Sequence, residues 1–328
     1  MCALKVLVVG GAGYIGSHMV KMLGQYGSSV TTLDDLSSGH RDAVLCGEFI
    51  QGDFGDRVVL DTVLSQGFDA VMHFASFIQV GESVHNPEKY YRNNVANTLG
   101  LLDAMRAHGV NKFIFSSTAA TFGEPQYTPI DEQHPQHPIN PYGRTKLIVE
   151  QALADYERAY DFKSVSLRYF NAAGADPEGQ LGERHEPETH LIPLVLQTAS
   201  GRRPHISVFG QDYDTPDGTC IRDYIHINDL CSAHWLALQS LLKGQRSQAY
   251  NLGNGSGFSV QEVIDVAEQV TGRKISVQYS PRRVGDPARL VANAKQAREQ
   301  LGWHPQYDEL ATIIQHAWMW EQKINSNS

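Results

Sequence analysis

Residues 6–17 have the sequence VLVVGGAGYIGS, an apolar run followed directly by closely spaced glycines. Gly11, Gly13 and Gly16 match the pattern G-x-G-x-x-G, and Gly10, Gly13 and Gly16 match G-x-x-G-x-x-G. Glycines at this spacing let the backbone turn sharply and approach a pyrophosphate, and the helix that follows points free N–H groups at the anion. The stretch predicts a strand, a dinucleotide-binding turn and a helix.

Acidic residues follow at the ends of the next two predicted strands. Asp34 lies 18 residues after Gly16 (34 − 16), where an acid binds the adenosine ribose in dinucleotide-binding folds. A carboxylate there accepts hydrogen bonds from both ribose hydroxyls and repels a 2′-phosphate, so we expect NAD in preference to NADP. The alternative is a solvated turn acid. Asp53, which ends FIQGD, is expected to contact the adenine edge.

Short β-branched runs alternate with amphipathic segments through the first half of the chain. The predicted strands are residues 5–9, 30–34, 48–52, 70–75, 112–117 and 164–170, and the predicted helices are residues 88–109 and 145–160. Several strands are apolar throughout, as expected when helices cover both faces of a parallel sheet. We predict an α/β fold with a doubly wound parallel (Rossmann) sheet.

The pattern changes after about Asn171. Residues 172–193 are rich in Gly, Pro and charge and predict a long loop. Beyond it, predicted helices at 191–200, 228–242, 260–270 and 310–322 and a strand at 274–279 indicate a smaller mixed α/β domain. We predict an NAD-binding domain at residues 1–172 and a C-terminal substrate domain at residues 173–328, with segments that return to pack on the first.

Composition and charge narrow the class of protein. The chain has 328 residues, of which 41% are hydrophobic and 19% charged, a composition that suits a packed globular core. Its net charge of −9 argues against a nucleic-acid partner. No stretch reaches the ~18 apolar residues of a membrane span, so no membrane partner is expected. The four cysteines are scattered, which favours free thiols in a cytoplasmic protein.

Residues 140–146, NPYGRTK, place Tyr142 and Lys146 at i and i+4, on one face of a predicted helix. Alone, this spacing is common. Here it follows a dinucleotide fingerprint and a strand that ends at Thr118, on the edge where open α/β sheets bind ligands. The combination resembles the extended short-chain dehydrogenase/reductase superfamily, whose signature is a hydroxyl residue with Tyr-x-x-x-Lys.

The superfamily resemblance implies catalytic roles for these residues. Tyr142 would be the general base, Thr118 its hydrogen-bonding partner, and Lys146 would tune the phenol and hold the nicotinamide ribose. A phenol of pKa about 10 is a poor base at neutral pH. We expect the lysine ammonium and the cationic nicotinamide ring to lower this pKa.

Further motifs resemble the UDP-glucose 4-epimerase family over nearly the whole chain, to about Trp303. They include HFASFIQVGESV (73–84), YYRNNV (90–95), FSSTAATFGE (115–124), LRYFNAAGADPEG (167–179), GTCIRDYIHINDL (218–230), YNLGNG (250–255) and PRRVGDPARLVAN (281–293). The resemblance implies an isomerase of galactose metabolism that binds NAD and interconverts UDP-galactose and UDP-glucose at C4. It also implies a homodimer.

The same resemblance implies binding roles for individual residues. Its cofactor-binding residues are Gly10, Gly13, Tyr14, Ile15, Gly16, Asp34, Asp53, Phe54, Phe74, Ala75, Asn93, Lys146 and Tyr169. Its substrate-binding residues are Thr118, Tyr142, Asn171, Leu191, Arg222, Arg283, Asp286 and Leu290. The two arginines would hold the diphosphate, Asp286 a ribose hydroxyl of UDP, and Leu191 would lie beside the uracil. Leu290 would face the 2-substituent of the sugar.

Some positions depart from the family pattern. Ile78 stands where many relatives carry a lysine near the cofactor. The contact that this lysine makes with NAD is therefore not expected here. Thr189 and His190 replace an asparagine pair. HEPETH, residues 185–190, echoes the metalloprotease motif H-E-x-x-H, but its histidines are five apart and Pro187 would disrupt the helix. We expect a solvated loop there and no metal.

Alternatives remain open. The enzyme could be an epimerase for another UDP-sugar, such as a UDP-N-acetylhexosamine or a UDP-pentose. A nucleotide-sugar 4,6-dehydratase is disfavoured, because Ala119 and Ala120 follow Thr118 where such enzymes carry an acid. A non-catalytic, NAD-sensing Rossmann regulator would often lack the tyrosine–lysine pair, which this chain keeps.

Overall fold

The computed structural model describes residues 3–283 and 286–326, and its centre is a seven-stranded parallel sheet with the order β11-β6-β5-β4-β1-β2-β3. The strands are β1 (Lys5–Val9), β2 (Ser29–Asp34), β3 (Glu48–Gln51), β4 (Ala70–His73), β5 (Lys112–Thr118), β6 (Lys163–Tyr169) and β11 (Gln248–Leu252). The connections change direction at β1, which pairs with β2 on one side and β4 on the other. The predicted doubly wound fold is confirmed, and the carboxyl ends of β1 and β4 form its switch point.

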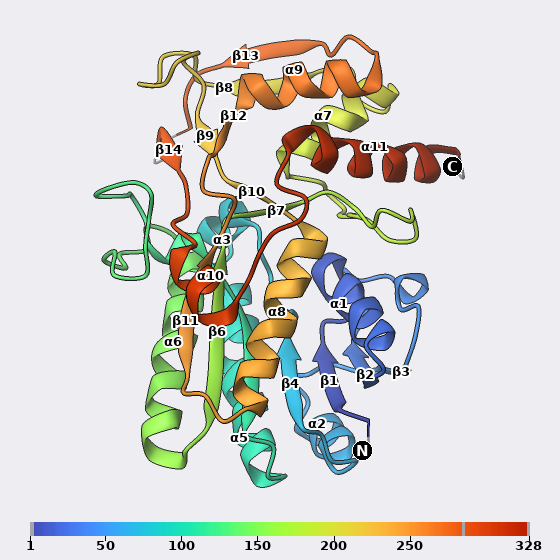
Figure 1. Ribbon diagram of the computed structural model, residues 1–328, viewed down its shortest axis with the longest axis vertical. Helices are drawn as coiled ribbons and strands as arrows, with labels where there is room; N and C mark the ends of the chain where they lie inside the picture. The colour runs from blue at the N-terminus through green and yellow to red at the C-terminus, as the bar shows by residue number, and fades with distance from the viewer. Residues whose placement is uncertain (1–2, 284–285, 327–328) are drawn as a thin grey trace.

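Helices bury both faces of this sheet (Figure 1). They are α1 (Tyr14–Gln25) and α8 (Ile227–Leu242) on one face, and α2 (Arg57–Leu64), α5 (Thr98–Ala107) and α6 (Pro141–Tyr160) on the other. Within β1, Val6 and Val8 pack towards the first set, whereas Leu7 and Val9 pack towards the second. The period of two explains why the strand is apolar at every position.

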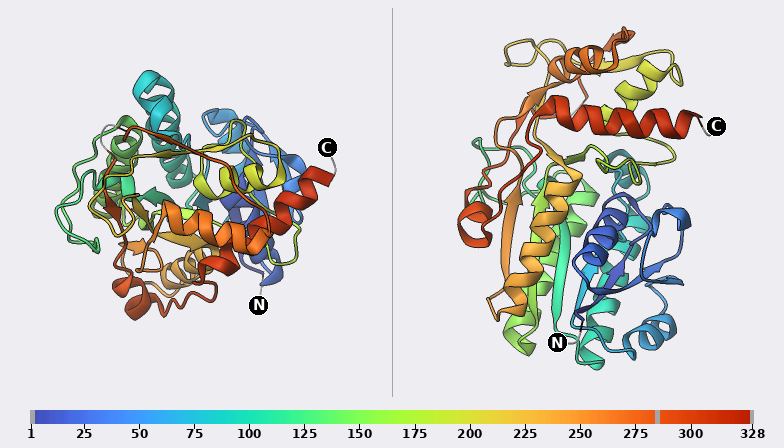
Figure 2. Two further views of the ribbon diagram at one scale, coloured as in Figure 1. Left: turned by 90° about the horizontal axis from the view of Figure 1, so that it is seen from above. Right: turned by 45° about the vertical axis from the view of Figure 1, so that its right-hand side comes forward.

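A later part of the chain, beyond residue 226, returns to the seven-stranded sheet. The strand β11, which was not predicted, pairs with β6, and α8 and α10 (Lys295–Leu301) pack beside it. Three further helices form a second layer above the carboxyl ends of the strands (Figures 1 and 2). They are α7 (Leu191–Ser200), α9 (Val260–Thr271) and α11 (Leu310–Ser326), which share a core with β8 (Ile206–Phe209) and β13 (Val277–Ser280).

Two small sheets connect the layers. One pairs β7 (Asn171–Ala173) with β10 (Tyr224–His226), and the other has the order β12 (Phe258–Ser259), β9 (Ile221–Arg222), β14 (Arg289–Leu290). In Figure 1, β7 and β10 lie between the main sheet and the upper helices, and β9 and β14 lie to the left of α7 and α11. Residues from distant parts of the sequence therefore meet at the edge where ligands bind in this fold class.

The prediction of one continuous helix at residues 88–109 is wrong for the middle of this segment. The structure divides it into α4 (Pro87–Tyr90), the π-helix η2 (Tyr91–Asn97) and α5, with α3 (Val80–His85) before them. The side chain of Asn94 accepts from the N–H of Phe77 and donates to its carbonyl, both at 3.0 Å. We attribute the widened turn to this contact with the segment after β4, and π-turns of this kind are frequent at functional sites.

Two expectations from composition concern cysteines and membrane segments. Cys46, Cys220 and Cys231 are free thiols, and Cys2 lies outside the described residues. Across residues 3–283 and 286–326, no helix combines the length and hydropathy that a membrane crossing requires.

Candidate active site

The glycine turn between β1 and α1 leaves no room for a side chain at Gly10 or Gly16. A Cβ on Gly10 would lie 2.4 Å from the backbone nitrogen of Ala75, and one on Gly16 would lie 2.1 Å from the carbonyl oxygen of Gly10. Gly10 also has a φ of +81°. Gly13 begins α1 without a side-chain cap, and the first turn carries no acid. Tyr14 and Ile15, in that turn, therefore present their N–H groups at the positive end of the helix dipole.

Asp34 lies beside this turn at the end of β2. Its carboxylate accepts from the backbone N–H of Ala12 at 2.9 Å and of Leu36 at 2.8 Å. Burial raises its pKa, and the two backbone N–H groups oppose the rise. The alternative of a solvated turn acid is wrong, because the residue is buried. Asp53 is exposed and its carboxylate accepts from the N–H of Gly55 at 2.7 Å.

Other predicted cofactor residues surround the glycine turn. Phe74 follows β4 and packs against the ring of His234, with centroids 5.0 Å apart. The amide of Asn93 donates to the carbonyl of Ala75 at 3.2 Å. Phe54 is buried and packs edge-on against His73. Phe74, Ala75 and Asn93 thus gather at the carboxyl end of β4, whereas Phe54 fills the core beneath.

Lys146 is buried on the inner face of α6. Its Nζ donates to the hydroxyl of Ser76 at 2.8 Å and to the carbonyl of Ser116 at 2.7 Å. Burial lowers its pKa to about 7, and the negative charge of Glu150 opposes this shift. The amine is therefore fixed in direction, and both its protonation states are accessible near neutral pH.

Tyr142 lies one turn before Lys146 on the same helix, and it is also buried. Burial raises the pKa of its phenol to about 12, and a hydrogen bond with Thr118 opposes the rise. The lysine Nζ lies 6.0 Å from the centre of the tyrosine ring. In the protein's own structure desolvation outweighs the Thr118 hydrogen bond, and the lowering of the phenol's pKa by the lysine and the nicotinamide stays a prediction.

The sequence analysis missed the groups that support this pair. The side chain of Asn140 caps α6 by accepting from the N–H of Gly143. One turn beyond Lys146, the carboxylate of Glu150 accepts from the guanidinium of Arg168 at 2.6 Å, and both side chains are buried. The hydroxyl of Ser117 also donates to Glu150. The spacing of Glu150 four residues after Lys146 is a signal that could have indicated this support.

Tyr169 closes the same region from β6. Its hydroxyl forms a short hydrogen bond with that of Ser116, and its ring lies 6.0 Å from that of His234. Burial raises the pKa of Tyr169, although the Ser116 hydrogen bond opposes the shift. The phenol therefore stays protonated and can donate a hydrogen bond.

Of the two predicted diphosphate residues, Arg222 lies on a small sheet above, and Arg283 lies in the segment between β13 and β14. Arg222, on β9, donates to the carboxylate of Asp286 in a short, partly buried ion pair, and to the carbonyl of Ile221 at 2.8 Å. Arg283 is exposed, with its guanidinium 3.9 Å from the ring of Phe209. Of the three charged residues predicted to bind UDP, the structure therefore pairs Arg222 with Asp286 in a salt bridge.

The remaining predicted substrate residues lie on β7, α7 and β14. The amide of Asn171 donates to the carbonyl of Asp223 at 2.9 Å, at the end of the main sheet. Leu191 is the first residue of α7. Leu290, on β14, lies opposite Arg222 and packs on a cluster that contains Ala119, the residue after Thr118. Leu290 therefore connects the small sheet to the segment that follows Thr118.

The loop before α7 does not match the expectation of a solvated segment. The side chains of Glu183 and Glu188 are only 4% and 5% exposed, and His185 and His190 lie against them. Burial alone would lower the pKa of His185, but the two carboxylates outweigh it and raise this pKa to about 10. Four polar side chains are therefore packed together where a free loop was expected.

Comparisons with known proteins agree with this geometry. Residues 6–253 match the model of the NAD dependent epimerase/dehydratase family. The chain is 54% identical to a UDP-glucose 4-epimerase of Rhizobium leguminosarum bv. trifolii over 328 residues, all of both chains. It is 52% identical to that of Halalkalibacterium halodurans over 98% of this chain and 96% of the other. The crystal structure of UDP-glucose 4-epimerase from Brucella ovis in complex with NAD superposes with a TM-score of 0.95, at 51% identity, over 96% and 98% of the two chains.

Proposed function

The chain belongs to the NAD dependent epimerase/dehydratase family and, within it, to the UDP-glucose 4-epimerases, and we propose which of its residues carry out the reaction. The enzyme is an isomerase that uses NAD to interconvert UDP-galactose and UDP-glucose at C4. The observation that carries the assignment of roles is the buried Tyr142–Lys146 pair, which faces the end of β5 beside the glycine turn.

The glycine turn and Asp34 have the features that NAD requires. Because Gly10 and Gly16 have no side chains, the backbone at Gly10 can lie against Ala75, and Gly16 can lie against the carbonyl of Gly10. The first turn of α1 has no side-chain cap, so its N–H groups are available for a pyrophosphate. The Asp34 carboxylate, held by two backbone N–H groups, is suited to the ribose hydroxyls. A bound NAD would supply the acceptor for the C4 hydride of the sugar and the donor that returns it.

Tyr142 acts as the general base in this proposal. Its phenolate removes the 4-hydroxyl proton of the sugar and gives it back after the 4-keto sugar has turned to present its other face. The hydrogen bond with Thr118 lowers the cost of the phenolate. The protein's own groups leave the Tyr142 pKa near 12. The positive charge of the oxidised nicotinamide ring would therefore have to lower this pKa further towards neutral pH.

Lys146 holds the reacting region in place. Its two hydrogen bonds to Ser76 and Ser116 use two of its three donors, and the third remains for a ribose hydroxyl. We propose that it orients the nicotinamide ribose from this position. Tyr169, Asn93 and Phe74 would form the wall on the β4 and β6 side.

The UDP moiety would bind between the small sheets and α7. Arg222 would exchange part of its bonding to Asp286 for the diphosphate, which frees the carboxylate to accept from a ribose hydroxyl. Arg283 would add a second guanidinium, with Asn171 on the sugar side and Leu191 beside the uracil. This assignment supports cofactor binding by residues 1–172 and substrate binding by residues 173–328.

We also propose a homodimer and a cytoplasmic location. Val80 and Val84 on α3 are 45% and 58% exposed, and they offer an apolar face on a helix of the NAD-binding half. Light scattering on the purified protein should give twice the mass of the chain. The cytoplasmic location rests on the free cysteines and remains a prediction.

The mechanism is tested with UDP-galactose that carries deuterium at C4. We expect UDP-glucose with the deuterium still at C4, because the hydride returns to the carbon from which it came. A product in which solvent hydrogen has replaced the label would contradict the mechanism. Formation of a stable keto sugar would instead indicate an oxidoreductase.

A further inference from the structure

Four metal-ligating side chains meet in the segment between β7 and α7. Glu183, His185, Glu188 and His190 each offer a ligand atom, and these atoms all lie within 4.8 Å of one another. They form two Glu-x-His pairs in the sequence ERHEPETH, residues 183–190. The cluster lies outside the residues to which we assign the epimerisation chemistry.

The distances inside the cluster suit a small ion. The Nδ1 atoms of His190 and His185 lie 2.5 Å and 3.0 Å from the same oxygen of Glu183, and 3.6 Å and 3.7 Å from the carboxylate of Glu188. For bonds of about 2.0–2.1 Å, the ligand atoms of a tetrahedral zinc ion lie about 3.3–3.4 Å apart. The four separations span this value, so slight movements would give that geometry.

Hydrogen bonding leaves part of the cluster unsatisfied. The Nδ1 atom of His185 is buried and, among the described residues, has no hydrogen bond of good geometry despite its short distance to Glu183. One carboxylate oxygen faces both imidazoles. Buried carboxylates are normally paired or bound to a metal. A divalent cation would displace the protons of the imidazoles, and the two carboxylates with two neutral imidazoles would then carry a charge of −2, which the cation neutralises.

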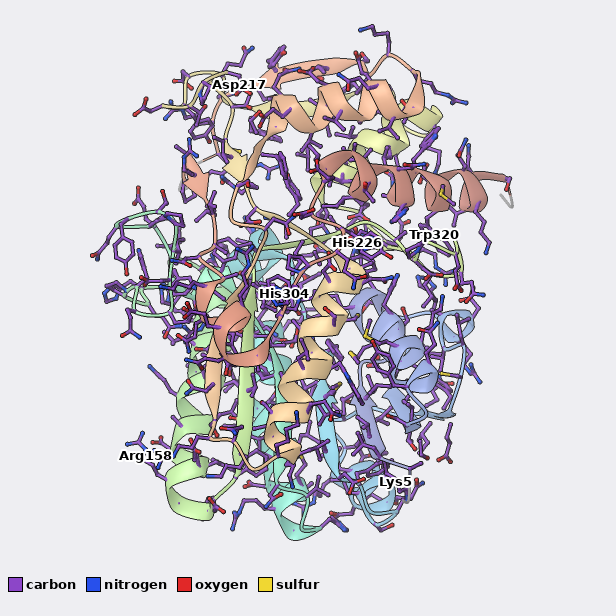
Figure 3. The ribbon with its side chains drawn as sticks, in the orientation of Figure 1. Lys5, Arg158, Asp217, His226, His304 and Trp320 are labelled. Atoms are coloured by element: carbon purple, nitrogen blue, oxygen red, sulfur yellow. The ribbon has the colours of Figure 1, made fainter. Side chains whose placement is uncertain are left out.

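The surrounding structure holds the ligands in place. The indole of Trp320 donates to the carbonyl of Glu183 at 3.1 Å, and Arg184 pairs with Asp42 at 2.6 Å. Glu188 accepts from the N–H of His190 at 2.9 Å, which fixes one of its oxygens. Figure 3 labels Trp320 at the level where the two layers meet. A site whose ligands are oriented before binding loses less entropy when the ion arrives.

An ion can reach the cluster from solvent. A cavity of about 950 Å³ is lined by Glu183, His185 and Glu188, together with Asp42 and Trp320. On its inner side the cluster contacts the cofactor half, since the ring of His185 packs edge-on against that of Tyr14, with centroids 6.3 Å apart. An ion there would tie the start of α7 to the first turn of α1.

We propose that Glu183, His185, Glu188 and His190 form a binding site for a divalent transition-metal ion of the zinc class. Imidazole and carboxylate ligands favour zinc or cobalt, whereas magnesium prefers six oxygens in octahedral geometry. The ion would have a structural role, as a clamp between α7 and the NAD-binding half, and would take no part in the hydride transfer.

The site is tested by titrating the NAD-containing enzyme, first treated with a chelator, with Co²⁺ and Zn²⁺. We expect one ion per chain with a Kd of about 1 μM or tighter. Bound Co²⁺ should give the intense visible absorption of tetrahedral coordination, and Zn²⁺ should displace it. Mg²⁺ should not compete. Absence of saturable Co²⁺ binding would overturn the proposal and leave the cluster as paired ions.

Variants locate the bound ion. The double variant His185→Gln/His190→Gln should abolish the absorption, whereas His316→Gln should keep it. His316 is the matched control, because its Nδ1 lies 3.0 Å from His226 in the second histidine pair of the described residues. Loss in His316→Gln with retention in the double variant would place the ion elsewhere and refute the site. If the double variant does not fold, Glu188→Gln should weaken Co²⁺ binding at least about tenfold, and an unchanged Kd would refute it.

Discussion

The glycine turn after β1 and the arginine on β9 both receive a diphosphate in the proposed complex, but they are prepared for it in opposite ways. In the turn the preparation is steric, because a Cβ at Gly16 would collide with the carbonyl of Gly10 at 2.1 Å. On β9 it is electrostatic, because Arg222 already pairs with Asp286. A rigid cradle suits a cofactor that stays bound, whereas exchange of ion partners suits a substrate that must leave.

The largest expected effect falls on α6, which carries Tyr142. Tyr142→Phe should lower kcat by at least about 10²-fold, because it removes the general base. It keeps the ring, so NAD content and affinity for UDP should remain those of the parent. Kinetics, cofactor analysis after denaturation and UDP titration check this.

Tyr156→Phe is the matched control for that experiment. Tyr156 lies 14 residues after Tyr142 on the same helix (156 − 142), about 21 Å along its axis, and its hydroxyl donates to Asp103 at 2.7 Å. Its kcat should be close to that of the parent. If Tyr142→Phe kept full activity, the phenol could not be the base.

The second effect concerns the free energy of unfolding. Burial lowers the Lys146 pKa to about 7, whereas in the unfolded chain it returns to 10.5. Between these values the unfolded state binds the extra proton, so stability rises as pH increases. The slope is at most about 1.4 kcal/mol per pH unit, or up to about 3 kcal/mol between pH 7 and 9.5.

Lys146→Met should remove this dependence. We expect the variant to be more stable than the parent at pH 7 and to lose that advantage towards pH 9.5, as measured by urea unfolding of both proteins. Other titrating groups cancel in the difference between the two curves. Parallel curves would mean that the amine stays charged in the folded protein, held by Ser76 and the Ser116 carbonyl.

The third effect tests the exchangeable ion pair. Arg222→Gln should raise KM for UDP-galactose about 10- to 100-fold, the range expected when a hydrogen bond to a charged group is lost, and should change kcat less. Arg282→Gln is the control, since that guanidinium pairs with the exposed Asp212 at 2.6 Å. Equal KM values for both variants would argue that Arg222 holds only Asp286.

The same contrast explains what the sequence could predict. The NAD-binding turn could be predicted from the sequence, because one short stretch contains the strand, the turn and the start of the helix. The glycines of this stretch are required by local backbone geometry. The predicted helices at 191–200 and 260–270 match α7 and α9 to within one residue, because their amphipathic period is local.

The rest depends on contacts between distant residues. The strand β11 lies 79 residues after β6 (248 − 169) and owes its place to pairing that local propensity does not encode. The phenol's raised pKa follows from burial, which no spacing reveals. The cluster at Glu183–His190 was rejected as a metal motif because Pro187 breaks a helix, yet an extended loop also brings those ligands together.

The smallest expected effect concerns which sugars fit, and it depends on Leu290. This residue lies opposite Arg222 on the small sheet and packs on the cluster that contains Ala119, so it connects β9 to the segment that follows β5. An acetamido group at C2 of the sugar would press on a partly buried leucine. Overpacking of this kind costs about 1–3 kcal/mol, or roughly 5- to 150-fold in rate. We therefore expect slower turnover of N-acetylated substrates.

Substitution at this position should shift that preference in both directions. Leu290→Ala should bring kcat/KM for UDP-N-acetylgalactosamine closer to that for UDP-galactose, because it removes the contact, and Leu290→Tyr should separate the two values further. Tyr213→Phe, on the nearby loop, is a control that leaves the size of the sugar pocket unchanged. Because the leucine also packs on Ala119, Phe122 and Ile130, the unfolding free energy of each variant has to be measured alongside. If the ratio of kcat/KM for UDP-galactose to kcat/KM for UDP-N-acetylgalactosamine stays near one in the parent and in both Leu290 variants, another residue bounds the sugar pocket.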